Sequence, residues 1–163
     1  MKKAFSIFIL IGMMMFSIPC SASMFDDLRN NPNYIYYGGV SIGVSFFMDK
    51  TSINVHQYKP PMYIIAFTNL TCKSGAPHEG FPENVTYGTK RYKYNYDTRQ
   101  MYCEVKKANG EISWEYIAPH KATKGYEYAQ LSGGEIAFYL AYNMSFYDEP
   151  ISFLAKKYIN SYK

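Results

Sequence analysis

The chain has 163 residues, with 17 Lys and Arg against 13 Asp and Glu, which gives a formal net charge of +4 at pH 7. Without Lys2 and Lys3, which fall in a predicted leader, 15 basic residues face 13 acidic ones, and a net charge of +2 is too weak to indicate nucleic-acid binding. Tyr (18 residues) and Phe (11 residues) are abundant, which suits a half-buried sheet or a contact surface.

Residues 1–22 have the pattern of a bacterial export signal. Two lysines precede the apolar run Ala4 to Ile18, and Cys20-Ser21-Ala22 offers small residues for cleavage. The run is shorter than the roughly 20 residues of a membrane-spanning helix, so a retained anchor is the less favoured interpretation. Lipidation of Cys20 is disfavoured because Pro19 precedes it. We therefore predict one exported domain, residues 23–163, located in the periplasm, at the outer cell surface or in the medium.

The first half of this domain has the composition of β-strands. Residues 23–33 are polar and rich in turn formers, which predicts a loose N-terminal segment before a short strand that starts near Tyr34. The runs 42–49 and 52–58 are rich in β-branched and aromatic residues, and Asp49 to Thr51 between them predicts a hairpin turn. Pro60-Pro61 ends this pattern, and Met62 to Thr71 follows as a nearly continuous apolar strand.

Lys73 to Thr86 contains two Gly, two Pro and Asn84 and is predicted to be a surface loop, either functional or a passive connector. After it, basic and aromatic residues alternate, so one face of the next strand should be basic and the other aromatic. This strand and the turn after it give the candidate binding surface, for which a solvated strand face is the alternative interpretation. Its residues are Lys90, Arg91, Tyr92, Lys93, Tyr94, Tyr96 and Arg99.

Asn109-Gly110 is the strongest hairpin signal in the chain. A two-residue turn there would place Val105 opposite Trp114 and Cys103 opposite Tyr116 on the buried face. The same register would set Glu104 across from Glu115 on the outer face. Such a carboxylate pair is used for acid and base catalysis, although two solvated surface carboxylates need no function.

Cys72 and Cys103 are the two cysteines that remain after the leader. In an oxidising compartment we predict that they form a disulfide, which would close a loop of roughly 30 residues and contribute about 3 to 4 kcal/mol. A metal site or a nucleophilic thiol is less favoured because neither cysteine belongs to a CxxC motif. The three histidines share no ligand spacing, so we predict neither a metal nor a cofactor.

The C-terminal third should be helical. Residues 119–132 are expected to be irregular, Gly133-Gly134 to open a helix from Glu135 to Tyr147, and Ile151 to Ile159 to form a shorter one. The first has little polar surface and must be covered on most sides. The predicted fold class is therefore α+β, an antiparallel sheet of about six strands with one or two C-terminal helices packed on it.

The segment Phe46 to Ile53 resembles the aromatic, Asp, Ser-Ile signature of surface-adhesin protein E-like domains, a family of small exported bacterial proteins. The strand Tyr92 to Tyr96, the segment Trp114 to Pro119 and the following helix keep the same order, so the similarity covers roughly residues 40–147. The resemblance implies an antiparallel sheet with a C-terminal helix on it and, for the adhesin itself, binding of host matrix proteins. It brings no catalytic residues, and the loop from Lys73 to Thr86 departs from the pattern.

Three functions follow as hypotheses. The first is a non-enzymatic exported envelope or surface protein that binds a host or envelope macromolecule, as an adhesin does. The second is a periplasmic small-ligand-binding or inhibitor-like module, and the third is a hydrolase that uses Glu104 and Glu115. A pocket lined by tyrosines would favour a small ligand, a flat tyrosine patch a partner protein, and carboxylates converging in a cleft an enzyme.

Overall fold

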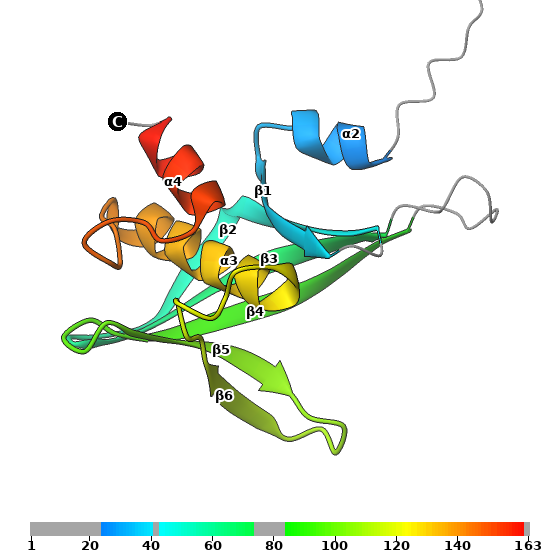
Figure 1. The fold of residues 1–163 in the computed structure, drawn as a ribbon. Coiled ribbons are helices and arrows are strands. Elements are labelled where there is room, and N and C mark those ends of the chain that lie inside the picture. Colours follow the sequence, from blue (N-terminus) through cyan, green and yellow to red (C-terminus); the bar gives the residue numbers. More distant parts are fainter. Residues whose placement is uncertain (1–23, 41–42, 74–83, 162–163) are drawn as a thin grey trace, which may run out of the picture.

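A computed structural model describes residues 24–40, 43–73 and 84–161, and it has the predicted α+β fold (Figure 1). Six antiparallel strands form one sheet in the order of the sequence. They are β1 (Tyr34–Val40), β2 (Val44–Lys59), β3 (Met62–Lys73), β4 (Asn84–Asn95), β5 (Gln100–Lys106) and β6 (Ile112–Tyr116). Three helices accompany them, α2 (Met24–Asn30), α3 (Gly125–Tyr142) and α4 (Phe153–Asn160).

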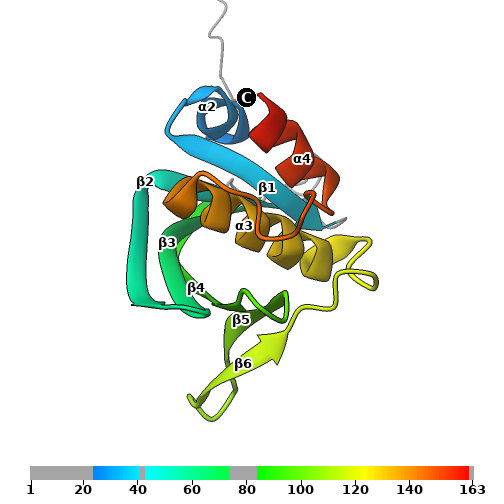
Figure 2. The same cartoon turned by 90° about the vertical axis from the view of Figure 1, so that its left-hand side faces the viewer.

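The sheet curves around α3, which lies inside the bend (Figure 2). Every residue of this helix from Ala129 to Tyr139 is buried, and the apolar residues are spread around its whole circumference rather than along one stripe. A helix of this kind is stable only when other elements cover it on most sides, as the sequence predicts. We call the sheet face that contacts α3 the inner face and the opposite one the outer face.

The helix is longer than predicted because Gly133 and Gly134 lie in its interior, not at its start. A Cβ added to Gly134 would lie 2.2 Å from Met101 Sδ, and one added to Gly133 would lie 2.9 Å from the hydroxyl of Tyr92. The two glycines therefore let α3 approach the sheet closely enough to pack on its aromatic residues. Residues 125–132, expected to be irregular, form the first two turns of the helix.

Alternation along β4 places two tyrosines on the inner face. Tyr92 and Tyr94 are fully buried beneath α3, and the Tyr94 hydroxyl donates a hydrogen bond of 2.8 Å to the carbonyl oxygen of Gly134. Met48 and Phe67 from β2 and β3 belong to the same core. Tyr92 and Tyr94 thus help to fill this core, and the Tyr94 hydroxyl reaches a backbone acceptor there.

A second, smaller core lies on the outer face. Leu28 of α2 packs with Phe47, Leu70 and Cys72, and Phe25 makes an edge contact with Phe47 at 5.6 Å between ring centroids. The prediction of a loose segment at residues 23–33 is therefore wrong for most of its length. The polar residues of α2 face water, while Phe25 and Leu28, three positions apart, pack the helix against the sheet.

The predicted hairpin at Asp49 to Thr51 is also wrong, because β2 runs through these residues as one strand. The pairing of β2 with β3 is interrupted between Asp49 and Asn54. At that irregularity an Asp49 carboxylate oxygen accepts hydrogen bonds from the backbone N–H and the hydroxyl of Thr51. Turn-forming residues thus build a bulge within a strand, which bends the strand without reversing it.

Glu135 connects the two C-terminal helices. Its buried carboxylate accepts hydrogen bonds from the backbone N–H groups of Ile151 at 2.6 Å and Ser152 at 2.9 Å. Ser152 in turn caps α4 by accepting from the N–H of Ala155 at 3.2 Å. The start of α4 is therefore fixed by one acidic side chain from the centre of α3.

Burial raises the pKa of Glu135 above its ordinary value of 4.5, and the hydrogen bonds from Ser152 and Ile151 only partly offset this. The folded state therefore binds an extra proton between pH 4.5 and the raised pKa, so this residue's contribution to stability decreases as pH rises through that window. We expect the stability of wild type relative to Glu135→Gln to fall across this window and then to level off. Urea unfolding at a series of pH values measures it, and parallel curves for the two proteins would contradict it.

None of the helices in residues 24–40, 43–73 and 84–161 is long and apolar enough to cross a membrane. The predicted leader lies outside the described residues. Most of the predicted loop Lys73 to Thr86 also lies outside them, although its ends belong to strands, Lys73 to β3 and Asn84 to Thr86 to β4.

Candidate functional site

The predicted binding surface divides between the two faces of the sheet. Arg91 and Lys93 lie on the outer face, as the alternation predicts, but Tyr92 and Tyr94 are buried in the core and cannot meet a macromolecule. Tyr96 is half-buried and stacks on Phe138 with 5.8 Å between ring centroids. The aromatic half of the prediction is therefore wrong, because α3 covers the face on which these tyrosines lie.

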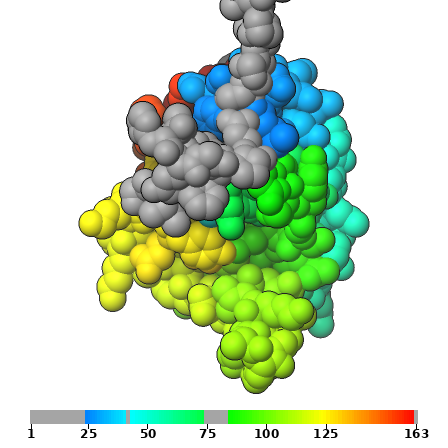
Figure 3. Space-filling view, turned by 90° about the vertical axis from the view of Figure 1, so that its right-hand side faces the viewer, coloured from blue at the N-terminus to red at the C-terminus, as the bar shows by residue number. Residues whose placement is uncertain are grey.

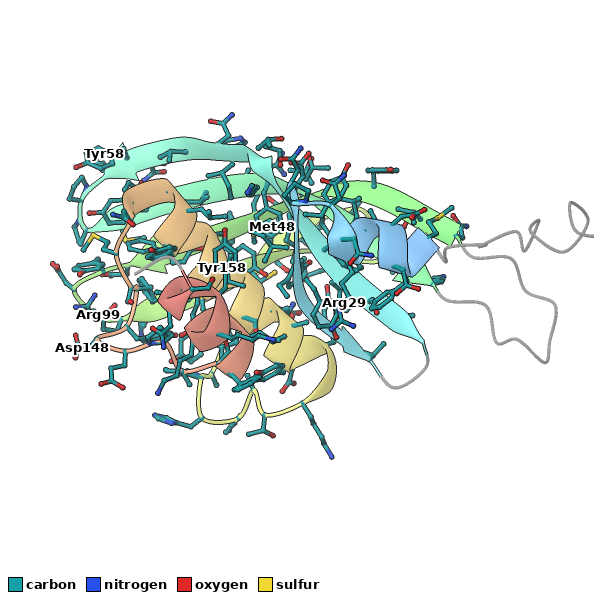
Figure 4. All side chains as sticks on the ribbon, turned by 90° about the horizontal axis from the view of Figure 1, so that it is seen from above. Arg29, Met48, Tyr58, Arg99, Asp148 and Tyr158 are labelled. Atoms are coloured by element: carbon teal, nitrogen blue, oxygen red, sulfur yellow. The ribbon has the colours of Figure 1, made fainter. Side chains whose placement is uncertain are left out.

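Arg99 has a structural role at the C-terminal segment. Its guanidinium lies 3.8 Å from the ring centre of Tyr96 and donates a hydrogen bond of 2.7 Å to the carbonyl oxygen of Phe146. It also forms an ion pair of 3.4 Å with Asp148, and Figure 4 shows these two side chains next to each other. Arg99 thus holds the segment that follows α3 against the turn between β4 and β5.

The hairpin of β5 and β6 has a different register from the predicted one. Cys103 pairs with Glu115, Glu104 with Trp114 and Val105 with Ser113. The loop contains three residues, because Lys107 donates to the carbonyl oxygen of Glu111 and Gly110 has a positive φ of 83°. This is the three-residue loop in which a type I turn is followed by a left-handed glycine. A shift of one residue turns Trp114 to the outer face.

The predicted carboxylate pair does not exist in this register. Glu115 shares the inner-face side of the hairpin with Cys103, whereas Glu104 lies on the outer face. Glu104 forms an ion pair of 2.8 Å with Arg91, in which both side chains are partly shielded from water. The two glutamates point away from each other, so the hydrolase hypothesis loses the geometry on which it depends.

No disulfide joins Cys72 to Cys103, and this prediction is wrong. Cys72 pairs across the sheet with Val85, while Cys103 pairs with Tyr92. These partners lie seven positions apart on β4, which corresponds to roughly 23 Å along the strand and, since seven is odd, to opposite faces. A disulfide needs Cα atoms within about 7 Å. Burial raises the pKa of the Cys103 thiol, although Lys90 and Gln130 lower it in part.

The outer face of β4, β5 and β6 brings a different set of residues together. Lys93 lies between two rings, with its ammonium 4.7 Å from the centre of Tyr102 and 5.2 Å from that of Trp114. Tyr116 packs on Tyr102 at 5.5 Å between centroids and is 51% exposed. We call this set the aromatic–basic face, and it consists of Arg91, Lys93, Tyr102, Glu104, Trp114 and Tyr116.

The aromatic–basic face is accessible because the hairpin of β5 and β6, which carries four of its six residues, projects from the body of the protein. Figure 3 shows this hairpin in yellow-green at the lower end of the molecule. The charges on the face are unbalanced, because Arg91 is neutralised by Glu104 whereas Lys93 and the exposed Lys106 form none of the ion pairs found among the described residues. The face therefore combines exposed aromatic area with a net positive charge.

Sequence reasoning found Arg91 and Lys93 but missed the three aromatic residues of this face. The signal was present, since Tyr102 alternates with Cys103 on β5 and Trp114 alternates with Glu115 on β6. This alternation places Trp114 on the outer face only if the loop has three residues, because a two-residue loop would place Trp114 on the inner face.

A groove lies between α2, β1 and α4, with a volume of about 350 Å³. Arg29 and Tyr158 line it from two sides (Figure 4). The groove is lined by residues from the end of α2, from β1 and from α4. The aromatic–basic face is the better candidate, since its aromatic and charged groups are in mutual contact.

No protein-family model matches the sequence, and the searches of curated proteins and of solved structures gave no match.

Proposed function

We propose that this protein is an exported bacterial envelope or surface protein, not an enzyme, that binds a partner protein through its aromatic–basic face. The observation that carries the proposal is Lys93, whose ammonium lies between the rings of Tyr102 and Trp114. Trp, Tyr and Arg are the residue types that dominate the binding energy of protein interfaces. Their concentration on one accessible patch favours a partner protein over a small ligand.

The charge of the patch specifies the partner further. A carboxylate of the partner that reaches Lys93 would be shielded from water by the two rings, which strengthens the ion pair relative to a fully exposed one. The partner segment is therefore acidic, and its apolar part covers Tyr116. Export is supported by the pattern of residues 1–22, and adhesin-like binding of a host or envelope protein by the resemblance in residues 40–147.

A photo-crosslinking amino acid at position 116 tests this proposal in the native cell. We expect it to trap a specific partner, whereas the same amino acid at position 87 should not. Tyr87 is a matched control, because it is 68% exposed and lies on β4 outside the aromatic–basic face. The proposed surface would be refuted if both positions gave the same crosslinked products, or if position 116 gave none. Probing the cell fractions for the protein tests export separately.

With the trapped partner purified, we expect Trp114→Ala to weaken binding at least about 30-fold, since truncating a central aromatic residue costs about 2 kcal/mol or more. Lys93→Glu should weaken binding similarly and reverse its salt dependence, because it replaces an attraction by a repulsion. Isothermal titration calorimetry measures both, with Tyr87→Ala as the variant that should bind like wild type. An unchanged affinity of Trp114→Ala for the partner would contradict the proposal.

A further inference from the structure

A cavity of about 130 Å³ lies between the inner face of the sheet and the first turns of α3, on the opposite side of the sheet from the aromatic–basic face. Tyr37 and Tyr92 form its buried part, while Tyr126, which is 49% exposed, and the half-buried Lys90 lie toward solvent. The cavity is therefore accessible from outside and reaches into the core. Its lining is partly aromatic and partly polar.

The hydrogen bonds around the cavity leave several donors unused. Lys90 donates to the hydroxyl of Tyr126 at 3.0 Å, so the proton of that hydroxyl remains available. Likewise the side-chain amide of Asn69 donates to Thr71, which leaves the Thr71 hydroxyl proton free to point elsewhere. Lys90 itself has one further N–H donor beyond those directed at Tyr126 and Cys103. These groups all line the same space.

The hydroxyl of Tyr92 is a buried donor next to the cavity. Tyr92 is fully buried, and its hydroxyl has no hydrogen-bond partner in the part of the chain that the structure describes. Leaving a buried polar group unsatisfied costs about 1 to 3 kcal/mol. The hydroxyl lies against Gly133, one turn along α3 from the cavity residues Ala129 and Gln130. Tyr92 itself lines the cavity, so its hydroxyl is a buried donor close to this space.

The electrostatics of the cavity select for negative charge. Among the described residues that line it, Lys90 is the only charged one and none is a carboxylate. Burial lowers the pKa of Lys90, but the neighbouring Cys103 and Tyr126 raise it above its ordinary value, so the side chain is cationic at neutral pH. Burial also raises the pKa of Tyr37 and of Tyr92, which keeps both phenols protonated; Tyr37 donates its proton to the side-chain oxygen of Asn69, whereas Tyr92 has no acceptor among the described residues.

We propose that this cavity binds a small organic monoanion, a carboxylate with a compact apolar group, whose charge pairs with Lys90 and whose oxygens accept from Tyr92, Tyr126 and Thr71. The size is consistent with this class, because an apolar cavity of about 150 Å³ in another protein holds benzene. The aromatic rings of Tyr37 and Phe46 line the remaining surface and match the apolar group. This site is independent of the partner surface.

Benzoate is the probe for this proposal, and benzamide is its neutral counterpart of nearly the same shape. We expect benzoate to bind the purified mature protein with a Kd of about 1 mM or tighter, and benzamide to bind at least tenfold more weakly because it lacks the charge that pairs with Lys90. Shifts of backbone amide NMR signals locate the site, and those of Thr71, Ala129 and Gln130 should move. Equal binding of the two compounds would overturn the proposal, as would no binding of benzoate.

Two variants separate the site from general effects on the fold. Lys90→Met should weaken benzoate binding roughly tenfold to a hundredfold, whereas Lys93→Met, three positions along the same strand and on the outer face, should not. Tyr92→Phe should leave the melting temperature unchanged or raise it, since it removes an unsatisfied hydroxyl, and should weaken benzoate binding about three- to tenfold. Benzoate binding that is the same in Tyr92→Phe and Lys90→Met as in wild type would refute the assignment.

Discussion

Replacing Phe138 by Ala should cost about 3 to 5 kcal/mol of folding free energy, which is the range for truncating a fully buried Phe. Phe138 is 1% exposed and lies in the centre of an aromatic cluster between α3 and the sheet. Its ring centroid lies 5.1 Å from those of Tyr94 and Phe146 and 5.0 Å from that of Tyr142. Removing the ring therefore leaves a cavity that three rings from different elements border. Urea unfolding measures the loss.

Phe153 provides the control for this prediction, because it has the same side chain in α4 but is 68% exposed. Phe153→Ala should change stability by less than about 0.5 kcal/mol, as is usual for surface positions. If the two variants lost equal stability, α3 would not be packed in the bend of the sheet as described.

Replacing Gly38 by Ala should cost about 2 to 4 kcal/mol, because two unfavourable effects act at one position. Gly38 has a φ of +154°, which side-chain-bearing residues rarely adopt, and an added Cβ would lie 2.5 Å from Cβ and 2.8 Å from Cα of Ala129. The second contact is with helix backbone, which cannot rotate away. Thermal or urea unfolding of the variant gives the change.

The matched control is Gly88→Ala in β4, where an added Cβ meets nothing within 4 Å. This change should be neutral or slightly stabilising. Ala129→Gly tests the contact directly, since in the Gly38→Ala background it should recover part of the loss while destabilising wild type. Additive effects of the two substitutions would show that the strain of φ alone, and not the contact with α3, explains the cost.

Alternation of side chains made much of the sheet predictable. The pattern from Arg91 to Tyr96 separates the two faces of β4, and the apolar run after Pro61 corresponds to β3. Helix α3 has apolar residues around its whole circumference, and this pattern indicates that other elements cover it on most sides. These features depend only on local periodicity, which the backbone geometry of strands and helices imposes directly.

The failures have a common cause, because they concern residues with two possible roles. Glycine permits a turn and also a close approach, and Gly133-Gly134 serves the second role. Asp49 and Thr51 form a turn elsewhere but a bulge here. Which role such a residue takes depends on the residues that contact it in the folded protein, and local sequence patterns do not reveal these contacts.

The candidate site was less predictable than the fold because it depends on register. One additional residue in the loop at Asn109-Gly110 separates Glu104 from Glu115 and joins Trp114 to Lys93. Cys72 and Cys103 likewise lie on neighbours of β4, but their partners on β4 are seven positions apart, which strand order alone does not reveal. An error of one position in strand register leaves the predicted fold class unchanged, but it changes which side chains meet on each face of the sheet.

Helix α3 follows the six strands in the sequence, and this order affects how the protein folds while it is being made. All six strands precede α3 in the chain, and each pairs only with its neighbour in sequence, so hairpins of the sheet can form one after another as the chain emerges. The inner face, with Tyr92, Tyr94 and Met48, nevertheless stays without its cover until residues 125–142 have followed. A chain that stops before Gly125 would therefore present a wide apolar surface to chaperones or to other copies of itself. Completion of the fold is thereby delayed until residues 125–142 have been made.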